Sequence, residues 1–170
     1  WADFRNKETL ITDIYKYNLT TNQESIVANS PDYEYNPFIN ENSIIYSRKT
    51  ANTNDLRIYN LTTSADTVIS SANLPDQIGT LDCNSAYVTY TKSNWPYKSL
   101  ELYSIENSSN STIYSSAEND ISTAILGNTQ VAYHISSPFD LFGSVMGYDI
   151  PNSSSYTIRD VGDTYWEISI

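Results

Sequence analysis

The strongest constraint on the fold is a short stretch that occurs twice. The segment DIYKYNLTT begins at Asp13, and DLRIYNLTT begins at Asp55, 42 residues later. A period of roughly 40–50 residues that holds four short strands is typical of a β-propeller blade. Four segments align on a tyrosine at spacings of 42, 44 and 45 residues, and these tyrosines are Tyr17, Tyr59, Tyr103 and Tyr148.

A second aromatic residue precedes each of these tyrosines, again at regular distances. The residues are Trp1, Tyr46, Tyr90 and Tyr133, at spacings of 45, 44 and 43. The chain has 15 Tyr and only 5 Gly, and it is rich in Ser, Thr and Asn. Aromatic and β-branched residues favour strands, and helix-forming residues never gather here at a 3.6-residue period. The predicted class is all-β, a β-propeller of about four blades made of four-stranded antiparallel sheets.

Each unit can be divided into four strands, called a to d in chain order. Strand interiors are apolar at successive positions, as in Leu56, Ile58 and Tyr59, because a blade is covered by neighbours on both faces. In the second unit the predicted strands are 36–40, 44–49, 55–61 and 66–71. In the third they are 78–83, 86–92, 99–105 and 111–116, and in the fourth 121–126, 130–136, 144–150 and 155–160. The predicted single domain, 1–170, has units at about 1–30, 31–71, 72–116, 117–160 and 161–170.

The two ends of the sequence suggest how the units close. The chain opens inside a strand b, WADFR, and ends on a strand a, WEISI at Trp166–Ile170. If that last strand pairs with the first, the strands form a closed ring of four blades, which leaves no open sheet edge. The alternative is that the chain is a piece of a larger propeller or array. The sequence leaves both open.

The charge excludes some classes of partner. The chain has 20 acidic and 9 basic residues, a formal net charge of −11 and a pI of about 4.2. This argues against nucleic acid and anionic membranes, and it suits a hydrated surface, cations or a basic partner. No apolar run approaches the roughly 18 residues of a membrane helix. The chain begins at Trp1 with neither a Met nor a signal peptide, so we expect a mature or trimmed product.

The pattern D-I-Y-x-Y-N-L-T-T, following an aromatic strand such as WADFRN, resembles TolB-type propeller repeats. It is most similar to repeats of archaeal surface-layer and other secreted archaeal proteins. The resemblance spans almost the whole chain, weakens in the third unit and is eroded in the fourth, where VMGYDIPN keeps only the tyrosine and the apolar frame. It implies a β-propeller on a cell surface, used for assembly or binding, and it implies no single activity.

Sequons for N-glycosylation fall in one class of position, at the end of strand c or in the c–d turn. They are Asn18, Asn60, Asn107, Asn110 and Asn152. One interpretation is compositional, because turns favour Asn, Ser and Thr. The other is that they mark surface loops of a secreted glycoprotein. Glycans there would keep the c–d rim free of protein contacts.

The opposite rim is expected to carry the longer b–c and d–a loops, which are rich in acidic and aromatic residues. Aromatic side chains in loops are candidate anchors for a protein partner or a sugar ring, although they can also cap the blade ends. Further acidic residues of these loops are Asp76, Glu118, Asp120, Asp160 and Asp163. The predicted binding face comprises Asp32, Tyr33, Glu34, Tyr35, Trp95, Tyr97, Phe139 and Phe142.

Catalytic and metal-binding patterns are sparse. His134, the single histidine, is expected to be a packed or edge residue of strand b, and no G-x-S-x-G nucleophile elbow occurs. Strand a offers only Asp82 and Glu167 as carboxylates for glycoside hydrolysis. The acidic segments PDYEYN and ENDIS lack EF-hand spacing, so no cofactor is predicted, with a weak calcium site as the alternative. The single cysteine, Cys83, is expected to be a buried small hydrophobe.

Two classes of function remain open. The first is a non-enzymatic structural, adhesive or protein-interaction component of a cell envelope or extracellular assembly. Its partners would be other surface chains or copies of itself. The second is a glycan-binding module or a polysaccharide-acting enzyme on a propeller scaffold. The repeats, the acidity and the sequons favour the first class and an extracellular location.

Overall fold

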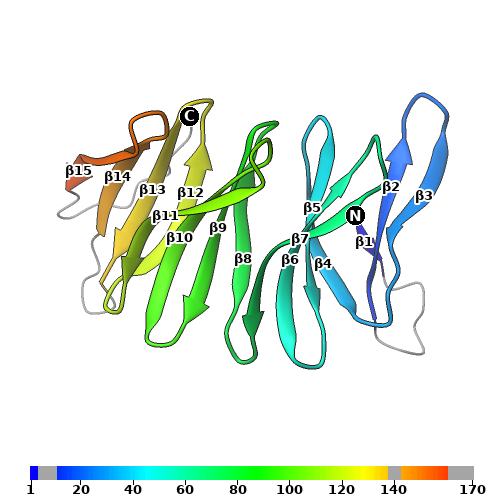
Figure 1. The fold of residues 1–170 in the computed structure, drawn as a ribbon, viewed down its shortest axis with the longest axis horizontal. Helices are drawn as coiled ribbons and strands as arrows, with labels where there is room; N and C mark the ends of the chain where they lie inside the picture. The colour runs from blue at the N-terminus through cyan, green and yellow to red at the C-terminus, as the bar shows by residue number, and fades with distance from the viewer. Residues whose placement is uncertain (4–10, 138–142, 161–170) are drawn as a thin grey trace. The chain divides into compact units, whose positions relative to one another are not determined.

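The computed structural model describes residues 1–3, 11–137 and 143–160 of the chain. Over these residues it contains fifteen strands in four antiparallel sheets and no helix (Figure 1). The all-β prediction is therefore confirmed. Within the described ranges, no helix is long and apolar enough to cross a membrane.

Residues 1–80 form the first of two compact units. A three-stranded sheet has the order β1-β2-β3, and a four-stranded sheet has the order β4-β5-β6-β7. An apolar cluster of Ile14, Ala28, Ile44, Tyr46 and Tyr59 joins the two sheets. The strands are β1 (Ala2–Asp3), β2 (Asp13–Asn18), β3 (Gln23–Ala28), β4 (Tyr33–Ile39), β5 (Ser43–Lys49), β6 (Thr53–Asn60) and β7 (Asp66–Asn73).

Residues 81–170 form the second unit, whose first strand begins just before the division. Its sheets have the orders β11-β10-β9-β8 and β12-β13-β14-β15. The strands are β8 (Ile78–Cys83), β9 (Tyr87–Asn94), β10 (Tyr97–Ser104), β11 (Ser109–Ser116), β12 (Asp120–Leu126), β13 (Gln130–Ser136), β14 (Gly143–Asp149) and β15 (Ser154–Asp160). Its core contains Leu100, Leu102, Ile113, Ala124, Val131, Tyr133 and Tyr148.

The strands follow one another as antiparallel neighbours, as the repeat predicts. The predicted strands 78–83 and 130–136 match β8 and β13, and several other strands extend one to three residues further. Strand β6 is covered on both faces, because the six residues from Asn54 to Tyr59 are all buried. Its interior is not wholly apolar, since Asn54, Asp55 and Arg57 are among them. The predicted closing strand, Trp166–Ile170, lies outside the described residues, so closure of the ring stays a prediction.

Every sheet carries a β-bulge at the same place, between its last two strands. The register of strand c shifts between Ile14 and Tyr15, Leu56 and Arg57, Leu100 and Glu101, and Val145 and Met146. An extra residue on strand d bends that strand and increases its twist. The extra residues are Val27, Ile69, Ile113 and Ile158.

The aromatic residue of strand b has a structural purpose in three of the four sheets. Tyr46, Tyr90 and Tyr133 are 0–2% exposed. The Tyr46 hydroxyl donates to Asp66 Oδ2 at 2.9 Å, and the Tyr90 hydroxyl donates to Asn110 Oδ1 at 2.8 Å. The Tyr133 hydroxyl interacts with the side chain of Ser155, which lowers its pKa against the larger effect of burial. In each case a buried hydroxyl, which needs a partner, meets a polar residue near the start of strand d.

The c–d turns also repeat their backbone geometry. A residue with positive φ precedes strand d in every sheet: Asn22 (54°), Ser64 (58°), Ser108 (49°) and Ser153 (50°). Asparagine visits this left-handed region more readily than most residues, whereas serine is strained there. Side-chain oxygens of Asn18, Asn60, Ser104 and Asp149 accept hydrogen bonds from the turn backbone. The frequent Asn and Ser of these turns therefore have a local structural cause.

Candidate functional site

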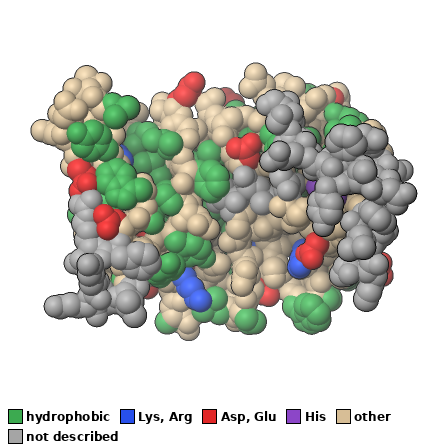
Figure 2. Space-filling model, turned by 180° about the vertical axis from the view of Figure 1, so that it is seen from behind, with side chains coloured by type: hydrophobic (Ala, Val, Ile, Leu, Met, Phe, Trp, Pro, Cys, Tyr) green, Lys and Arg blue, Asp and Glu red, His purple; other side chains and the backbone are tan. Residues whose placement is uncertain are grey.

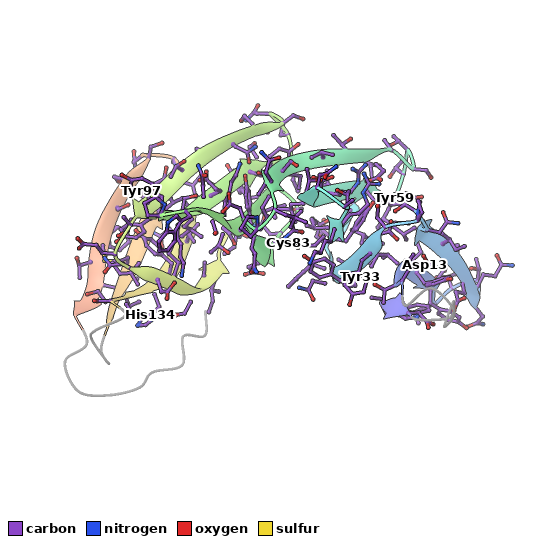
Figure 3. The ribbon with its side chains drawn as sticks, turned by 90° about the horizontal axis from the view of Figure 1, so that it is seen from below. Asp13, Tyr33, Tyr59, Cys83, Tyr97 and His134 are labelled. Carbon is purple, nitrogen blue, oxygen red and sulfur yellow. The ribbon has the colours of Figure 1, made fainter. Side chains whose placement is uncertain are left out.

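The structure places part of the predicted binding face differently from the sequence analysis. Tyr33, Glu34 and Tyr35 open strand β4 and do not lie in a loop, so that part of the prediction is wrong. Their backbone pairs with β5, where Tyr33 is opposite Lys49 and Glu34 opposite Arg48. Asp32 lies in the bend just before β4, and Phe139 and Phe142 are outside the described residues. Figure 3 shows Tyr33 on β4 and Asp13 on β2, both in the first unit.

The polar residues at this end of β4 form a row across the whole sheet. Glu34 pairs with Arg48, Arg48 with Asp55, and Asp55 with Ser71, on four neighbouring strands. Residues opposite one another in this way point to the same face of a sheet. The Ser71 hydroxyl donates to Asp55 Oδ1 at 2.5 Å, and Arg48 Nη2 lies 3.9 Å from Asp55 Oδ2. We call Glu34, Arg48, Asp55 and Ser71 the polar row.

Glu34 is the buried end of the polar row. Its side chain is 0% exposed, and its Oε1 accepts hydrogen bonds from the Ser30 backbone amide at 3.1 Å and from the Ser30 hydroxyl. The other oxygen, Oε2, is buried and has no hydrogen-bond partner among the described residues. The segment just before β2 covers this region, because Glu34 N donates to Thr12 O at 3.1 Å. The predicted partner contact at Glu34 therefore has no exposed surface in this structure.

The electrostatics of Glu34 follow from this burial. Loss of hydration raises the pKa of its carboxyl, because the charged form is destabilised in a poorly polar environment. The hydrogen bonds from Ser30 act against that rise, the negative charge of Asp13 adds to it, and the positive charge of Arg48 lowers it. Arg48 Nε also lies 3.9 Å from Asp32 Oδ2. The guanidinium of Arg48 thus interacts electrostatically with the carboxylates of Asp32, Glu34 and Asp55.

Of the two tyrosines beside Glu34, Tyr35 is held in place by a hydrogen bond within the sheet. Tyr33 and Tyr35 have ring centroids 5.2 Å apart at 33°. The Tyr35 hydroxyl donates to Asn54 Oδ1 at 2.9 Å, and Asn54 is itself buried. Tyr33 is 37% exposed. Of this pair, Tyr33 is the one with substantial surface for a partner.

The hairpin β9–β10 presents the most exposed aromatic side chain of the described residues. Asn94 pairs with Tyr97, so Trp95 and Pro96 form a two-residue connection at its tip. Trp95 is 88% exposed and Tyr97 56%. Figure 3 shows Tyr97 on this hairpin. Trp95 lies in a turn, as predicted, whereas Tyr97 is the first residue of β10 and not a loop residue.

An ion pair lies close to the tip of this hairpin, where Lys98 pairs with Ser93. Lys98 Nζ, on β10, contacts Asp120 Oδ1 at the start of β12. Asp120 is therefore a strand residue and not a loop residue, and Asp160 is likewise the last residue of β15. Both side chains of the pair are half exposed, which limits its energetic contribution. The pair nevertheless links the aromatic hairpin to the neighbouring sheet. Asp76 and Glu118 do lie between strands, and Asp163 is outside the described residues.

The single histidine lies beside a serine that the sequence analysis did not consider. Ser122 Oγ is 2.8 Å from His134 Nδ1, and Ser122 is the extra residue where β12 bulges against β13. Gly143 makes room for the ring, because a Cβ there would lie 2.3 Å from His134 Nε2. A hydrogen bond between the Ser122 hydroxyl and the His134 imidazole can hold a shared proton. The spacing of the two residues in the sequence does not predict this contact, because it depends on the bulge in β12.

Asp82 links two strands of the second unit, and Cys83 follows it at the end of β8. Asp82 Oδ2 accepts from Leu126 N at 2.9 Å, so this carboxylate, which was a candidate for catalysis, ties β8 to β12. Cys83 is partly buried, and burial, with a smaller contribution from Asp82, raises the pKa of its thiol to about 11. The other strand-a carboxylate, Glu167, lies outside the described residues.

The described carboxylates do not converge on a metal site. Over 1–3, 11–137 and 143–160, no group of three or more His, Cys, Asp or Glu side chains is arranged to hold a metal ion. On the face shown in Figure 2, the acidic side chains are dispersed and form no single patch. The segment PDYEYN supplies Asp32 and Glu34 to the polar row and its surroundings instead.

Comparison with known proteins identifies the fold. No protein-family model matches the chain, and no curated protein matches its sequence. The fold is that of TolB-like β-propeller structures. TolB from Agrobacterium tumefaciens matches 94% of this chain and 60% of its own at 15% identity, with a TM-score of 0.60. TolB from Acinetobacter baumannii matches 86% and 37% at 15% identity, with a TM-score of 0.56.

An oligogalacturonate lyase in complex with manganese is also similar in structure. It matches 93% of this chain and 44% of its own at 10% identity, with a TM-score of 0.63. The chain therefore spans 37% to 60% of the lengths of these three structures. At such identities the likeness establishes the fold alone.

Proposed function

We propose that this chain is part of a TolB-like β-propeller that acts as a non-enzymatic structural, adhesive or protein-interaction component at a cell surface or in an extracellular assembly. The finer resemblance of its repeats to archaeal surface-layer proteins belongs to this proposal, as does its division into four-stranded blades. Partners are other surface chains or copies of the chain itself. The observation that carries the proposal is Trp95, 88% exposed at the tip of the β9–β10 hairpin.

The hairpin has the properties of a preorganised anchor. Its two strands pair without interruption from Asn94–Tyr97 to Tyr87–Ser104. The continuous strand pairing limits the conformational freedom that is lost on binding, and the Lys98–Asp120 ion pair adds a contact with the neighbouring sheet beside the turn. Tryptophan and tyrosine dominate the energetics of protein interfaces because they bury a large area with few rotatable bonds. Trp95 and Tyr97 together provide such a surface.

The test is the variant Trp95→Ala. A buried aromatic anchor contributes about 2 kcal/mol or more, so association should weaken by roughly thirtyfold or more. Folding should be unaffected, because the side chain is almost wholly exposed. Self-association can be followed by sedimentation velocity, and association with the source organism's cell envelopes by cosedimentation.

Two variants serve as controls. Leu19→Ala removes another large exposed apolar side chain, 85% exposed, in a c–d turn. Asn60→Gln removes a sequon on the same class of turn. Both should associate normally. Normal association by Trp95→Ala, with loss in either control, would mean that the binding rim is the other one.

Glycan binding is the second candidate, and the same hairpin favours it. Aromatic rings such as Trp95 and Tyr97 stack on the apolar faces of sugar rings. The same alternative includes an enzyme that acts on polysaccharide. Titration of Trp95 fluorescence with neutral oligosaccharides distinguishes it from protein binding, since saturable quenching that is lost in Tyr97→Ala would favour the glycan.

A further inference from the structure

The five sequons occupy three different hydrogen-bonding situations in the folded chain. N-glycosylation attaches a sugar to the amide nitrogen Nδ2 of asparagine. A folded acceptor must therefore present Nδ2 without disrupting the bonds that form its turn. The sequons can be compared on this criterion, because all five asparagines belong to described residues.

Asn18 and Asn60 use only their side-chain oxygen. Asn18 Oδ1 accepts from the backbone amides of Thr20 and Thr21 at 2.9 and 3.0 Å. Asn60 Oδ1 accepts from Thr62 and Thr63, both at 2.9 Å. In both residues Nδ2 makes no hydrogen bond with any residue that the structure describes. We call Asn18 and Asn60 the turn-cap asparagines.

Asn107 and Asn152 use the nitrogen itself. Asn107 Nδ2 donates to Ser104 Oγ at 3.2 Å, and Asn152 Nδ2 donates to Asp149 Oδ2 at 3.1 Å. Each is followed by a serine with positive φ, Ser108 or Ser153. Their amide groups thus face back onto the turn and help to close it.

Asn110 is not in a turn, which corrects the sequence analysis. It is the second residue of β11 and pairs with Tyr103. Its Oδ1 accepts the hydroxyl of the buried Tyr90. Asp66 accepts from Tyr46 in the sheet before it. The residue at this position is therefore explained by the need of a buried tyrosine for an acceptor.

We propose that Asn18 and Asn60 are the acceptor sites for an N-linked sugar, and that Asn107, Asn110 and Asn152 are structural residues whose sequons are not used in the folded protein. The proposal rests on the surface location proposed above, and it is independent of the Trp95 hairpin. It predicts a defined pattern of two occupied sites among five.

The transfer is chemically consistent with the turn geometry. Nδ2 attacks the anomeric carbon of a sugar linked to a lipid pyrophosphate. A C–N bond forms, the C–O bond to the pyrophosphate breaks, and the lipid pyrophosphate leaves with the electron pair. One amide proton passes to a base of the transferase, and one N–H remains on Nδ2. The Oδ1 bonds to Thr20 and Thr21, or to Thr62 and Thr63, stay intact.

The experiment uses the full chain, purified in folded and unglycosylated form. It is incubated with a purified oligosaccharyltransferase and a lipid-pyrophosphate-linked oligosaccharide, and intact mass and peptide mapping locate the sugar. We expect up to two additions, on Asn18 and Asn60. Thr20→Ala and Thr62→Ala, which keep the turn-cap asparagines but destroy their sequons, should each remove one addition.

Matched controls are Ser109→Ala and Ser154→Ala, which destroy the sequons of Asn107 and Asn152 and should change nothing. Synthetic peptides that span each of the five sequons show whether the transferase accepts each sequence when it is unfolded. We expect all five peptides to be modified. Sugar on Asn107, Asn110 or Asn152 of the folded chain would overturn the proposal. So would an unmodified folded chain when the Asn18 and Asn60 peptides react. Either result leaves the Trp95 test of the proposed function unaffected.

Discussion

The hydroxyl of Tyr90 on β9 donates a 2.8 Å hydrogen bond to Oδ1 of Asn110 on β11, two strands away in the same sheet. Tyr90 is 2% exposed, so its hydroxyl has no water to replace that acceptor. Asn110, which belongs to a glycosylation sequon, is thus the hydrogen-bond acceptor for the buried hydroxyl of Tyr90. The same relationship between Tyr46 and Asp66 shows that it belongs to the repeat.

This relationship predicts the response to substitution at position 110. Asn110→Ala should lower the free energy of unfolding by about 1–2 kcal/mol, because a buried hydroxyl loses its partner. Asn110→Asp should lose much less, because an oxygen acceptor remains, as at Asp66. Urea denaturation of both variants, alone and with Tyr90→Phe, measures the coupling. Equal stability of the Ala and Asp variants would rule out the bond as a significant contribution.

The buried carboxyl of Glu34 predicts a pH dependence of stability. Its pKa is higher in the folded than in the unfolded chain, because burial disfavours the charged form. Its contribution to stability is therefore fully present below the unfolded pKa and is lost as pH rises through the folded pKa. Glu34→Gln keeps an acceptor for Ser30 and removes the titration.

The Gln variant should consequently gain stability relative to the parent chain as the pH rises above 4.5, the ordinary pKa of a glutamate. Thermal denaturation at a series of pH values measures the difference, and Asp76→Asn, which changes an acidic residue between strands, is the control. A constant difference across these pH values would show that Glu34 does not titrate differently on folding.

Gly143 should not tolerate a side chain. A Cβ there would lie 2.2 Å from the carbonyl oxygen of Ile135 and 2.3 Å from His134 Nε2. Gly143→Ala should therefore cost about 1–3 kcal/mol, which is a shift of several degrees in Tm. At Gly127 a Cβ would meet only Gln130 O at 3.4 Å, so Gly127→Ala is the matched control. A second variant, His134→Ala with Gly143→Ala, should recover only part of the loss, since the Ile135 carbonyl remains.

Cys83 should be a slow nucleophile. Burial, aided by the Asp82 charge, raises the pKa of its thiol from 9.0 to about 11. Because the thiolate is the reactive species, alkylation by iodoacetamide at pH 8 should be roughly a hundredfold slower than for an unperturbed thiol. In concentrated urea the rate should return to the ordinary value. A rate that is already high in the native chain would contradict the burial of this thiol.

The sequence by itself determined the repeating all-β architecture. Tyrosines at 42- to 45-residue spacings, with apolar residues at successive strand positions, indicate short strands that must be covered on both faces. This information is local, because strand propensity and turn chemistry depend on neighbouring residues in the chain. For that reason β8 and β13 were placed to the residue, and the turns that follow Asn18 and Asn60 were identified correctly.

Only the tertiary structure decided which side chains are buried and which groups they contact. The sequence predicts Glu34 as an exposed acidic loop residue, yet Thr12, just before β2, and Arg48 of β5 lie against it. Ser122 meets His134 only because a bulge adds one residue to β12. Burial and hydrogen bonding join residues on different strands, and a shift of one residue in register reverses the face on which a side chain lies. Spacing along the chain predicts that strands exist, whereas pairing between strands decides what each residue does.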